Sequence, residues 1–196
     1  MRSFFRFFIL PLVGFLLVIV MGYLGLQIGT YVHGQVNQGR FVRWQSIGTP
    51  GSRIVQILGA DFGSVYVETE DGKVFDGRVR YCLDKNEKDH CWLPISRNEV
   101  LPQPDSACPG VDYFTISQPP ESGLARIDLQ GCYVETSERV VYLLGASGNI
   151  WVWRHGTSAA QSFVTGVIIV YGCALLGGLI GLVSAIVFFK KIWPDE

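Results

Sequence analysis

Four of the five cysteines lie in the middle of the chain, between two long apolar stretches. Cys82 and Cys91 flank a polar loop with little apolar content, which a disulfide would hold in place. Four cysteines allow three pairings, and we favour Cys82 with Cys91 and Cys108 with Cys132, because the first pair closes a short excursion. Zinc is the alternative, since His90 adjoins Cys91, but the spacing fits no two-residue zinc knuckle. We therefore predict disulfides and no metal site.

The other reactive side chains form no catalytic pattern. The loop around Ser147 approaches a nucleophile elbow but lacks the final glycine at the required spacing, so a hairpin loop explains it better. The three histidines, His33, His90 and His155, show no metal-binding spacing. The sequence also lacks a glycine-rich phosphate loop ending in Lys-Ser or Lys-Thr. We therefore expect a protein that is not an enzyme and carries no cofactor.

Two tryptophans share one face of a predicted strand. Because side chains alternate between the two faces of a strand, Trp151 and Trp153 point to one side together with His155. Such a face could stack on a sugar or bind a partner. It could equally fill the core of a sheet or rest on lipid headgroups. We favour the core or headgroup role and keep the pair as a possible aromatic binding face.

The elements that must position these residues begin with two apolar stretches, Phe7 to Ile28 and Phe163 to Phe189, which contain no Asp, Glu, Lys, Arg or His. As helices, both reach the roughly 30 Å thickness of bilayer hydrocarbon. Basic residues, which favour the cytoplasmic side, stand at the chain ends: Arg2, Arg6, Lys190 and Lys191. We predict two transmembrane helices with cytoplasmic termini, and a central domain outside the cytoplasm, where thiols oxidise.

The predicted spans divide the chain into a cytoplasmic tail 1–6, a helix 7–29, an extracytoplasmic domain 30–161, a helix 162–189 and a second tail 190–196. The first span could instead be a cleaved signal peptide, which would leave a single anchor. Its apolar run exceeds the usual core of about 7 to 15 residues, and residues 22–27 offer no clear cleavage site, so we expect retention. The lack of any Asn-x-Ser or Asn-x-Thr acceptor favours a bacterial envelope, and hence the plasma (inner) membrane.

Small residues recur at four-residue spacing on both spans, which places them on one face of each helix. They are Gly25, Gly29, Cys173, Gly177, Gly181 and Ala185. Such faces allow helix backbones to approach closely. The simplest interpretation is that the two spans of one molecule pack together, and packing with another chain is the alternative.

The charge balance argues against nucleic acid as a partner. The chain has 16 basic and 17 acidic residues, and removing the four basic and two acidic residues of the tails leaves 12 and 15 in the central domain. Nucleic-acid binding proteins carry a basic surface, which this balance does not provide. The bilayer, another membrane or envelope protein, or a second copy of the chain are the partners that we expect.

The central segment has the pattern of an all-β domain. The alternating sequence Ser64–Thr69, followed by Asp71-Gly72 and then 73–75, predicts a hairpin. A second hairpin is predicted between 139–144 and 150–154, through a loop rich in Gly, Ser and Asn. Further strands are predicted at 41–45, 53–58, 113–116, 125–129 and 132–135. Short strands separated by turn residues suggest a sandwich or a barrel.

The fold class predicted from these features is a membrane protein in which two terminal transmembrane helices flank one all-β domain that contains disulfides. The cytoplasmic tails are too short to hold an effector domain. We therefore interpret the protein as a non-enzymatic binding or scaffolding module, an accessory subunit of a membrane assembly. The alternative is a homo-oligomeric channel with two spans per subunit, although the spans offer few polar side chains to line a pore.

Overall fold

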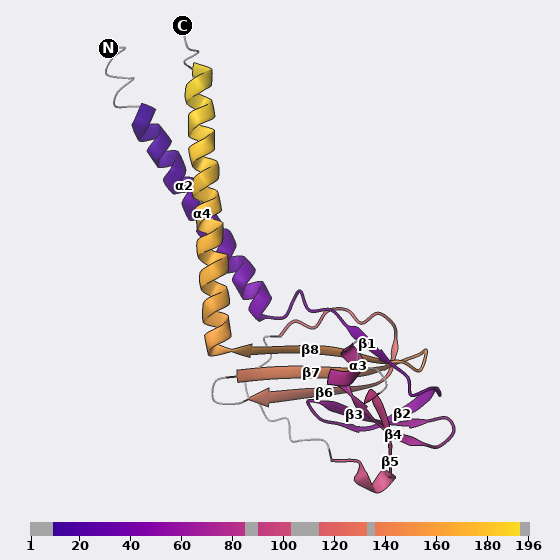
Figure 1. Cartoon of the computed structure of the whole chain (residues 1–196). Coiled ribbons are helices and arrows are strands. Elements are labelled where there is room, and N and C mark those ends of the chain that lie inside the picture. Colours follow the sequence, from indigo (N-terminus) through magenta and orange to yellow (C-terminus); the bar gives the residue numbers. More distant parts are fainter. Residues whose placement is uncertain (1–9, 85–89, 103–113, 133–135, 193–196) are drawn as a thin grey trace, which may run out of the picture. The chain divides into compact units, whose positions relative to one another are not determined.

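The computed structural model describes residues 10–84, 90–102, 114–132 and 136–192 (Figure 1). The chain divides into two compact units, one made of Met1–Asn37 with Ala159–Glu196 and the other of Gln38–Ser158. The first unit contributes two long helices and the second contains the β-strands. Arg2, Arg6 and Cys108, on which some predictions rest, lie outside the described residues.

The two helices are α2, Leu10–Asn37, and α4, Ala159–Ile192. Each is long and apolar enough to cross a membrane, as judged from length and composition. Both extend beyond the predicted ends, which were 29 for the first helix and 162 for the second. The apolar run marks where hydrophobic side chains stop, whereas backbone hydrogen bonding continues the helix through the polar residues that follow. The compact unit that contains the strands is Gln38–Ser158, and the predicted limits of the membrane-spanning part of each helix stay a prediction.

Helices α2 and α4 pack against each other in antiparallel fashion through small residues (Figure 1). A Cβ atom built on Gly29 would lie 2.8 Å from Cα of Val170, and one on Gly181 would lie 2.9 Å from Cα of Val18. Gly25 faces the backbone carbonyl of Cys173 in the same way, and Gly177 faces that of Met21. The six small residues singled out in the sequence therefore lie in this interface, because Ala185 packs beside Gly14 at its far end.

The second unit contains two four-stranded antiparallel sheets in its described part. The first sheet has the order β1–β8–β7–β6, with bounds Gln45–Gly48, Ile150–Ser158, Thr136–Gly145 and Gly123–Cys132. The second has the order β2–β3–β4–β5, with bounds Ile54–Ala60, Ser64–Thr69, Val74–Arg78 and Trp92–Ile95. Helix α3, Val79–Leu83, and a 3-10 turn, Arg97–Glu99, complete the described elements.

Both predicted hairpins are present. Strands β3 and β4 are joined at Asp71-Gly72, where Gly72 has a φ of 75°, a conformation that glycine adopts without steric cost. Strands β7 and β8 are joined by a loop in which Gly148 has a φ of 85°. The strands predicted at 53–58 and 125–129 are also present, as parts of β2 and β6.

Two predicted strands are wrong. Residues 41–44 form a turn and an irregular segment, and the strand β1 begins only at Gln45. Residues 114–116 are irregular as well, although Phe114 is almost fully buried. These two segments are apolar because they cover a sheet, and not because they belong to one. Of the strand predicted at 132–135, only Cys132 lies within the described residues, at the end of β6.

One core cluster unites the two sheets. Its fully buried members include Val65 and Val67 of β3 together with Leu129, Val140 and Val152 of the other sheet. Tyr142 of β7 adds a polar link, since its hydroxyl donates to the carbonyl oxygen of Asp61 at 3.0 Å. Burial raises the pKa of this tyrosine hydroxyl above its ordinary value, so the hydroxyl keeps its proton and remains a donor.

An ion-pair network lies on strands β6 and β7. Arg139 donates to both oxygens of the Asp128 carboxylate, at 2.9 and 2.8 Å, and Arg126 donates to the same carboxylate at 2.9 Å. Burial raises the pKa of Asp128, but the hydrogen bonds from the two arginines outweigh it and hold the pKa below its usual value. The carboxylate is therefore charged at neutral pH and ties the two strands together.

Candidate functional site

Of the possible aromatic binding face, Trp153 is not available to a ligand, whereas Trp151 is partly exposed. Trp153 is fully buried, and its indole nitrogen donates to the carbonyl oxygen of Val42 at 3.3 Å. Phe114 packs over it in a second small core cluster. The irregular segments that include Val42 and Phe114 thus cover this face of the sheet. The two rings were expected to fill a core or to meet lipid, and Trp153 does the former.

Trp151 is held by a carboxylate at the edge of the same sheet. Its indole nitrogen donates to Glu121, and the Ser147 hydroxyl donates to the same oxygen at 2.8 Å. The hydrogen bond from Trp151, followed by those from Ser147, lowers the pKa of Glu121 below its usual value. The loop around Ser147, which resembles a nucleophile elbow, is therefore a hairpin loop fixed by Glu121, and the Ser147 hydroxyl is hydrogen-bonded to Glu121 and Asn149.

The predicted disulfide between Cys82 and Cys91 is present, with a Cα–Cα distance of 4.4 Å. Cys132 is disulfide-bonded as well, and its predicted partner, Cys108, lies outside the described residues. Cys82 and Cys91 line a cavity of about 360 Å³ together with Trp92 and the polar residues around β1. Both cysteines are buried, so this disulfide lines the cavity as a structural crosslink and offers no exposed reactive group.

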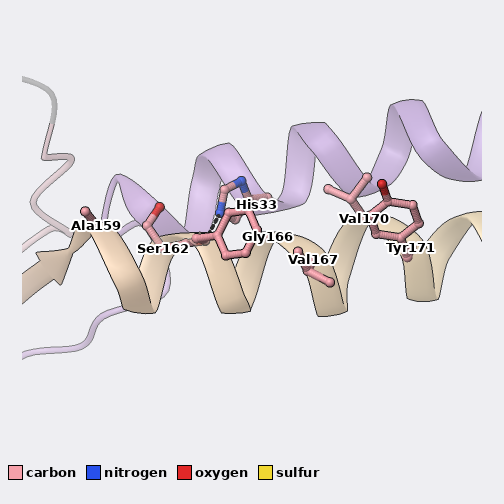
Figure 2. Close-up of a pocket in the computed structure, with 8 residues that line it drawn as sticks. His33, Ala159, Ser162, Gly166, Val167, Val170 and Tyr171 are labelled. Carbon is pink, nitrogen blue, oxygen red and sulfur yellow. Dashed lines mark hydrogen bonds between the residues drawn. The ribbon is translucent and has the colours of Figure 1, made fainter.

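A larger groove lies on the helix pair, on the side of the chain ends that lead to the β-strands (Figure 2). It has a volume of about 520 Å³, within the range of ligand sites. The residues that line it are His33 of α2 and, from α4, Ala159, Ser162, Phe163, Gly166, Val167, Val170 and Tyr171. One end of the groove is polar, and the rest is apolar except for the tyrosine hydroxyl.

The polar end is a cluster of three side chains from both helices. His33 Nε2 lies 3.0 Å from the carbonyl oxygen of Ser162 and 3.1 Å from the amide nitrogen of Asn37. That amide donates to the Ser162 hydroxyl oxygen at 2.8 Å. Nε2 donates to the carbonyl in one tautomer and accepts from the amide in the other, so either form of the imidazole finds a partner. The cluster therefore fixes the ring at the polar end of the groove (Figure 2).

Gly166 is what allows the histidine ring to lie there. A Cβ atom on this residue would come within 2.9 Å of the imidazole. His33 and Asn37 continue the four-residue spacing of Gly25 and Gly29 along α2, so the polar cluster is the last part of the helix interface. This spacing is a sequence signal that could have located the cluster.

The two cavities offer polar groups and apolar walls, a combination suited to binding a ligand. Among the described residues, no group of three or more His, Cys, Asp or Glu side chains is placed to hold a metal ion. Comparison of the chain with protein-family models, with curated proteins and with solved structures found no match. Evidence on function therefore comes from the two units themselves. The β-domain has a cavity lined by a disulfide, and the helix pair has an amphipathic groove.

Proposed function

We propose that the protein is a two-span membrane protein whose β-domain acts outside the cytoplasm as a binding or scaffolding module, as an accessory subunit of a membrane assembly. It carries out no reaction of its own in this proposal. The two sheets, which share one core cluster, form a sandwich-like scaffold that presents loops to a partner.

The observation that carries the proposal is the distribution of side-chain size on the helix pair. The interface is built from glycine, alanine and cysteine, while large apolar side chains point outward and are more than half exposed, among them Phe15, Leu175 and Leu179. In water this arrangement would leave an extensive apolar surface uncovered. In a bilayer it is favourable, because lipid chains solvate the outer face and small residues let the backbones approach.

The orientation is supported by the disulfide and by the basic residue at the end of α4. A Cys82–Cys91 bond persists best in an oxidising compartment, which supports a position of the β-domain outside the cytoplasm. Lys190, which is exposed near the end of α4, then lies on the cytoplasmic side, as basic residues next to a span tend to do.

Membrane topology is tested with single introduced cysteines and a maleimide that does not cross membranes. Leu124→Cys places a thiol at an exposed position of the β-domain, and Lys190→Cys is its matched counterpart at the opposite end of α4. In intact cells we expect labelling of the first variant only, and labelling of the second after permeabilisation. The reverse pattern would refute the orientation, and extraction of the protein by alkaline carbonate would refute membrane insertion.

The accessory role is tested by extracting the full-length protein in a mild detergent and measuring its native mass. We expect a complex with a second protein in fixed stoichiometry that persists when the extract is diluted. A ring of three or more copies would instead indicate the channel, and a monomer under gentle extraction would contradict both assembly models.

A further inference from the structure

If the helices cross a membrane, as proposed above, the position of the groove along the bilayer normal follows from the sequence of α4. About 20 residues of helix cross roughly 30 Å of hydrocarbon. The apolar run of α4, residues 163–189, is longer than this, and a long run is accommodated by tilting, so its outer end at Phe163 lies at the edge of the hydrocarbon. Ser162 directly precedes this run, and Val167 and Val170 lie about 6 to 11 Å deeper than Phe163 at 1.5 Å per residue. The groove then runs from the headgroup layer at Ser162 into the hydrocarbon at Val170.

The polarity of the groove lining changes along this direction in the same order as the polarity of a phospholipid, from a polar headgroup to apolar acyl chains. Phe163, Val167 and Val170 supply an apolar wall, and His33 with Ser162 supplies the polar end. Ser162 accepts a hydrogen bond from Asn37 through its hydroxyl oxygen, and that bond does not use the hydroxyl hydrogen. A bound group that accepts hydrogen bonds, such as a phosphate or an ester oxygen, would satisfy this donor.

We propose that the groove binds one phospholipid of the surrounding bilayer, with its phosphate oxygens at Ser162 and His33 and one acyl chain along Val167 and Val170. This inference rests on the proposed membrane insertion. The site is continuous with the α2–α4 interface, so a bound lipid contacts both helices at the point where they lead into the β-domain.

A phospholipid fits the groove better than the helix of a partner protein. A helix is about 10 Å across and needs a groove with a wall on both sides, whereas the α2 side of this groove is lined by His33 alone. The apolar face of a partner helix also brings no hydrogen-bond acceptor to the polar end of the groove, whereas a phosphate does.

The test fills the groove without touching the polar cluster. Val167→Trp adds a ring to the apolar wall, and Ile168→Trp adds the same ring one position along, where Ile168 is 68% exposed and does not line the groove. Full-length protein in mild detergent is titrated with phosphatidylglycerol and, separately, with diacylglycerol, and bound lipid is counted by native mass spectrometry.

We expect wild type and Ile168→Trp to hold one phosphatidylglycerol with equal affinity, and Val167→Trp to bind it at least tenfold more weakly. Ser162→Ala, which leaves the wall intact, should weaken phosphatidylglycerol several-fold and leave diacylglycerol unchanged. Equal binding by both tryptophan variants would overturn the proposal, as would loss of a copurifying protein instead of a lipid from Val167→Trp. Resistance of each variant to carbonate extraction, measured on membranes before detergent is added, separates failure of this site from failure of membrane insertion.

Discussion

The two units of this protein are stabilised by opposite uses of side-chain size. In the helix pair, glycines bring the backbones together and the large apolar residues point away from the interface. In the β-domain, large residues such as Trp153 and Tyr142 are fully buried. The difference is the one expected if the helices cross a membrane, as proposed, since water drives large apolar groups inward and lipid does not. Adding volume should therefore damage the helix pair, and removing volume should damage the β-domain.

The largest effect is expected from Trp153→Ala, which deletes a fully buried indole from the β-domain. Lost burial and the cavity left behind should lower the free energy of unfolding by about 3 to 5 kcal/mol. Urea unfolding of the full-length protein in micelles, followed by tryptophan fluorescence, measures this change. Phe41→Ala removes a ring that is 64% exposed and should change stability by less than about 0.5 kcal/mol. Equal effects of the two substitutions would contradict the assignment of Trp153 to a core.

Gly25→Leu should separate the helices, because its side chain would occupy the space of the Cys173 backbone. Backbone atoms cannot yield as a flexible side chain does, so we expect a cost of about 3 kcal/mol in helix association. Paired spin labels at the exposed residues Ile19 and Leu182, in a Cys173→Ala background, report the distance between the helices. Gly172→Leu is the matched control, since no atom lies within 4 Å of a Cβ at that position, and the distance should stay unchanged. An unchanged distance in Gly25→Leu would refute the packing.

Replacing both Cys82 and Cys91 by Ala should destabilise the β-domain and leave the helix pair intact. The disulfide closes a loop with a sequence separation of 9, for which loop-closure entropy gives a contribution of roughly 2 to 3 kcal/mol. Reduction of the wild type should destabilise the domain by more than the double substitution does, because Cys132 is disulfide-bonded as well, and reduction of the double variant measures the effect of that second bond alone. A double variant as stable as the wild type would show that the loop is held by other contacts.

Asp128→Asn weakens the ion-pair network of β6 and β7, and we expect a loss of about 1 to 2 kcal/mol at neutral pH, because this carboxylate is only half-buried. The folded-state pKa lies below the unfolded value of about 3.9, so the stabilisation is complete above that pH and disappears as pH falls through the folded pKa. The difference between wild type and variant should therefore shrink in acid. Lys73→Met, which removes a solvent-exposed ion pair with Asp71, should have a negligible effect at any pH. A difference that is independent of pH would contradict the role of the carboxylate charge.

The smallest effect is expected from Leu179→Ala on the outer face of α4, where the side chain is 57% exposed. In a bilayer this substitution exchanges one lipid-facing apolar group for another, so helix association should change by less than about 0.5 kcal/mol. Leu129→Ala is the same exchange at a fully buried position of the β-domain and should lower its unfolding free energy by about 2 to 5 kcal/mol. Similar costs for the two would remove the contrast between the units.

The features that the sequence predicted correctly are those fixed by neighbouring residues. The Asp71-Gly72 turn and the loop near Gly148 determine their hairpins through local backbone conformation. The small-residue interface follows from four-residue spacing within each helix. The short strand β5 was missed, since it contains Pro94 and depends on pairing with β4, and α3 has only five residues.

The remaining errors concern contacts between distant parts of the chain. Residues 41–44 and 114–116 have the composition of strands, but tertiary packing places them over a sheet as irregular segments. The polar cluster at the groove joins His33 to Ser162, which are separated by 129 residues, and single-sequence patterns carry little information on such a pair. Helices α2 and α4 extend beyond the predicted spans, because hydropathy reports on side chains and not on backbone hydrogen bonding.

The hydrogen bond between Asn37 and Ser162 joins the two helices at the ends of the segment Gln38–Ser158, so it helps to close this segment into a loop. The β-domain is inserted between two helices that remain side by side, so the segment Gln38–Ser158 is a ring even when its sheets are unfolded. By the same chain-entropy model that describes crosslinks, closing a loop of about 100 residues costs the unfolded chain roughly 4 to 5 kcal/mol in entropy. The paired helices therefore stabilise the domain as a crosslink would, by lowering the entropy of its unfolded chain. The domain released from its helices should have a lower free energy of unfolding than the tethered one.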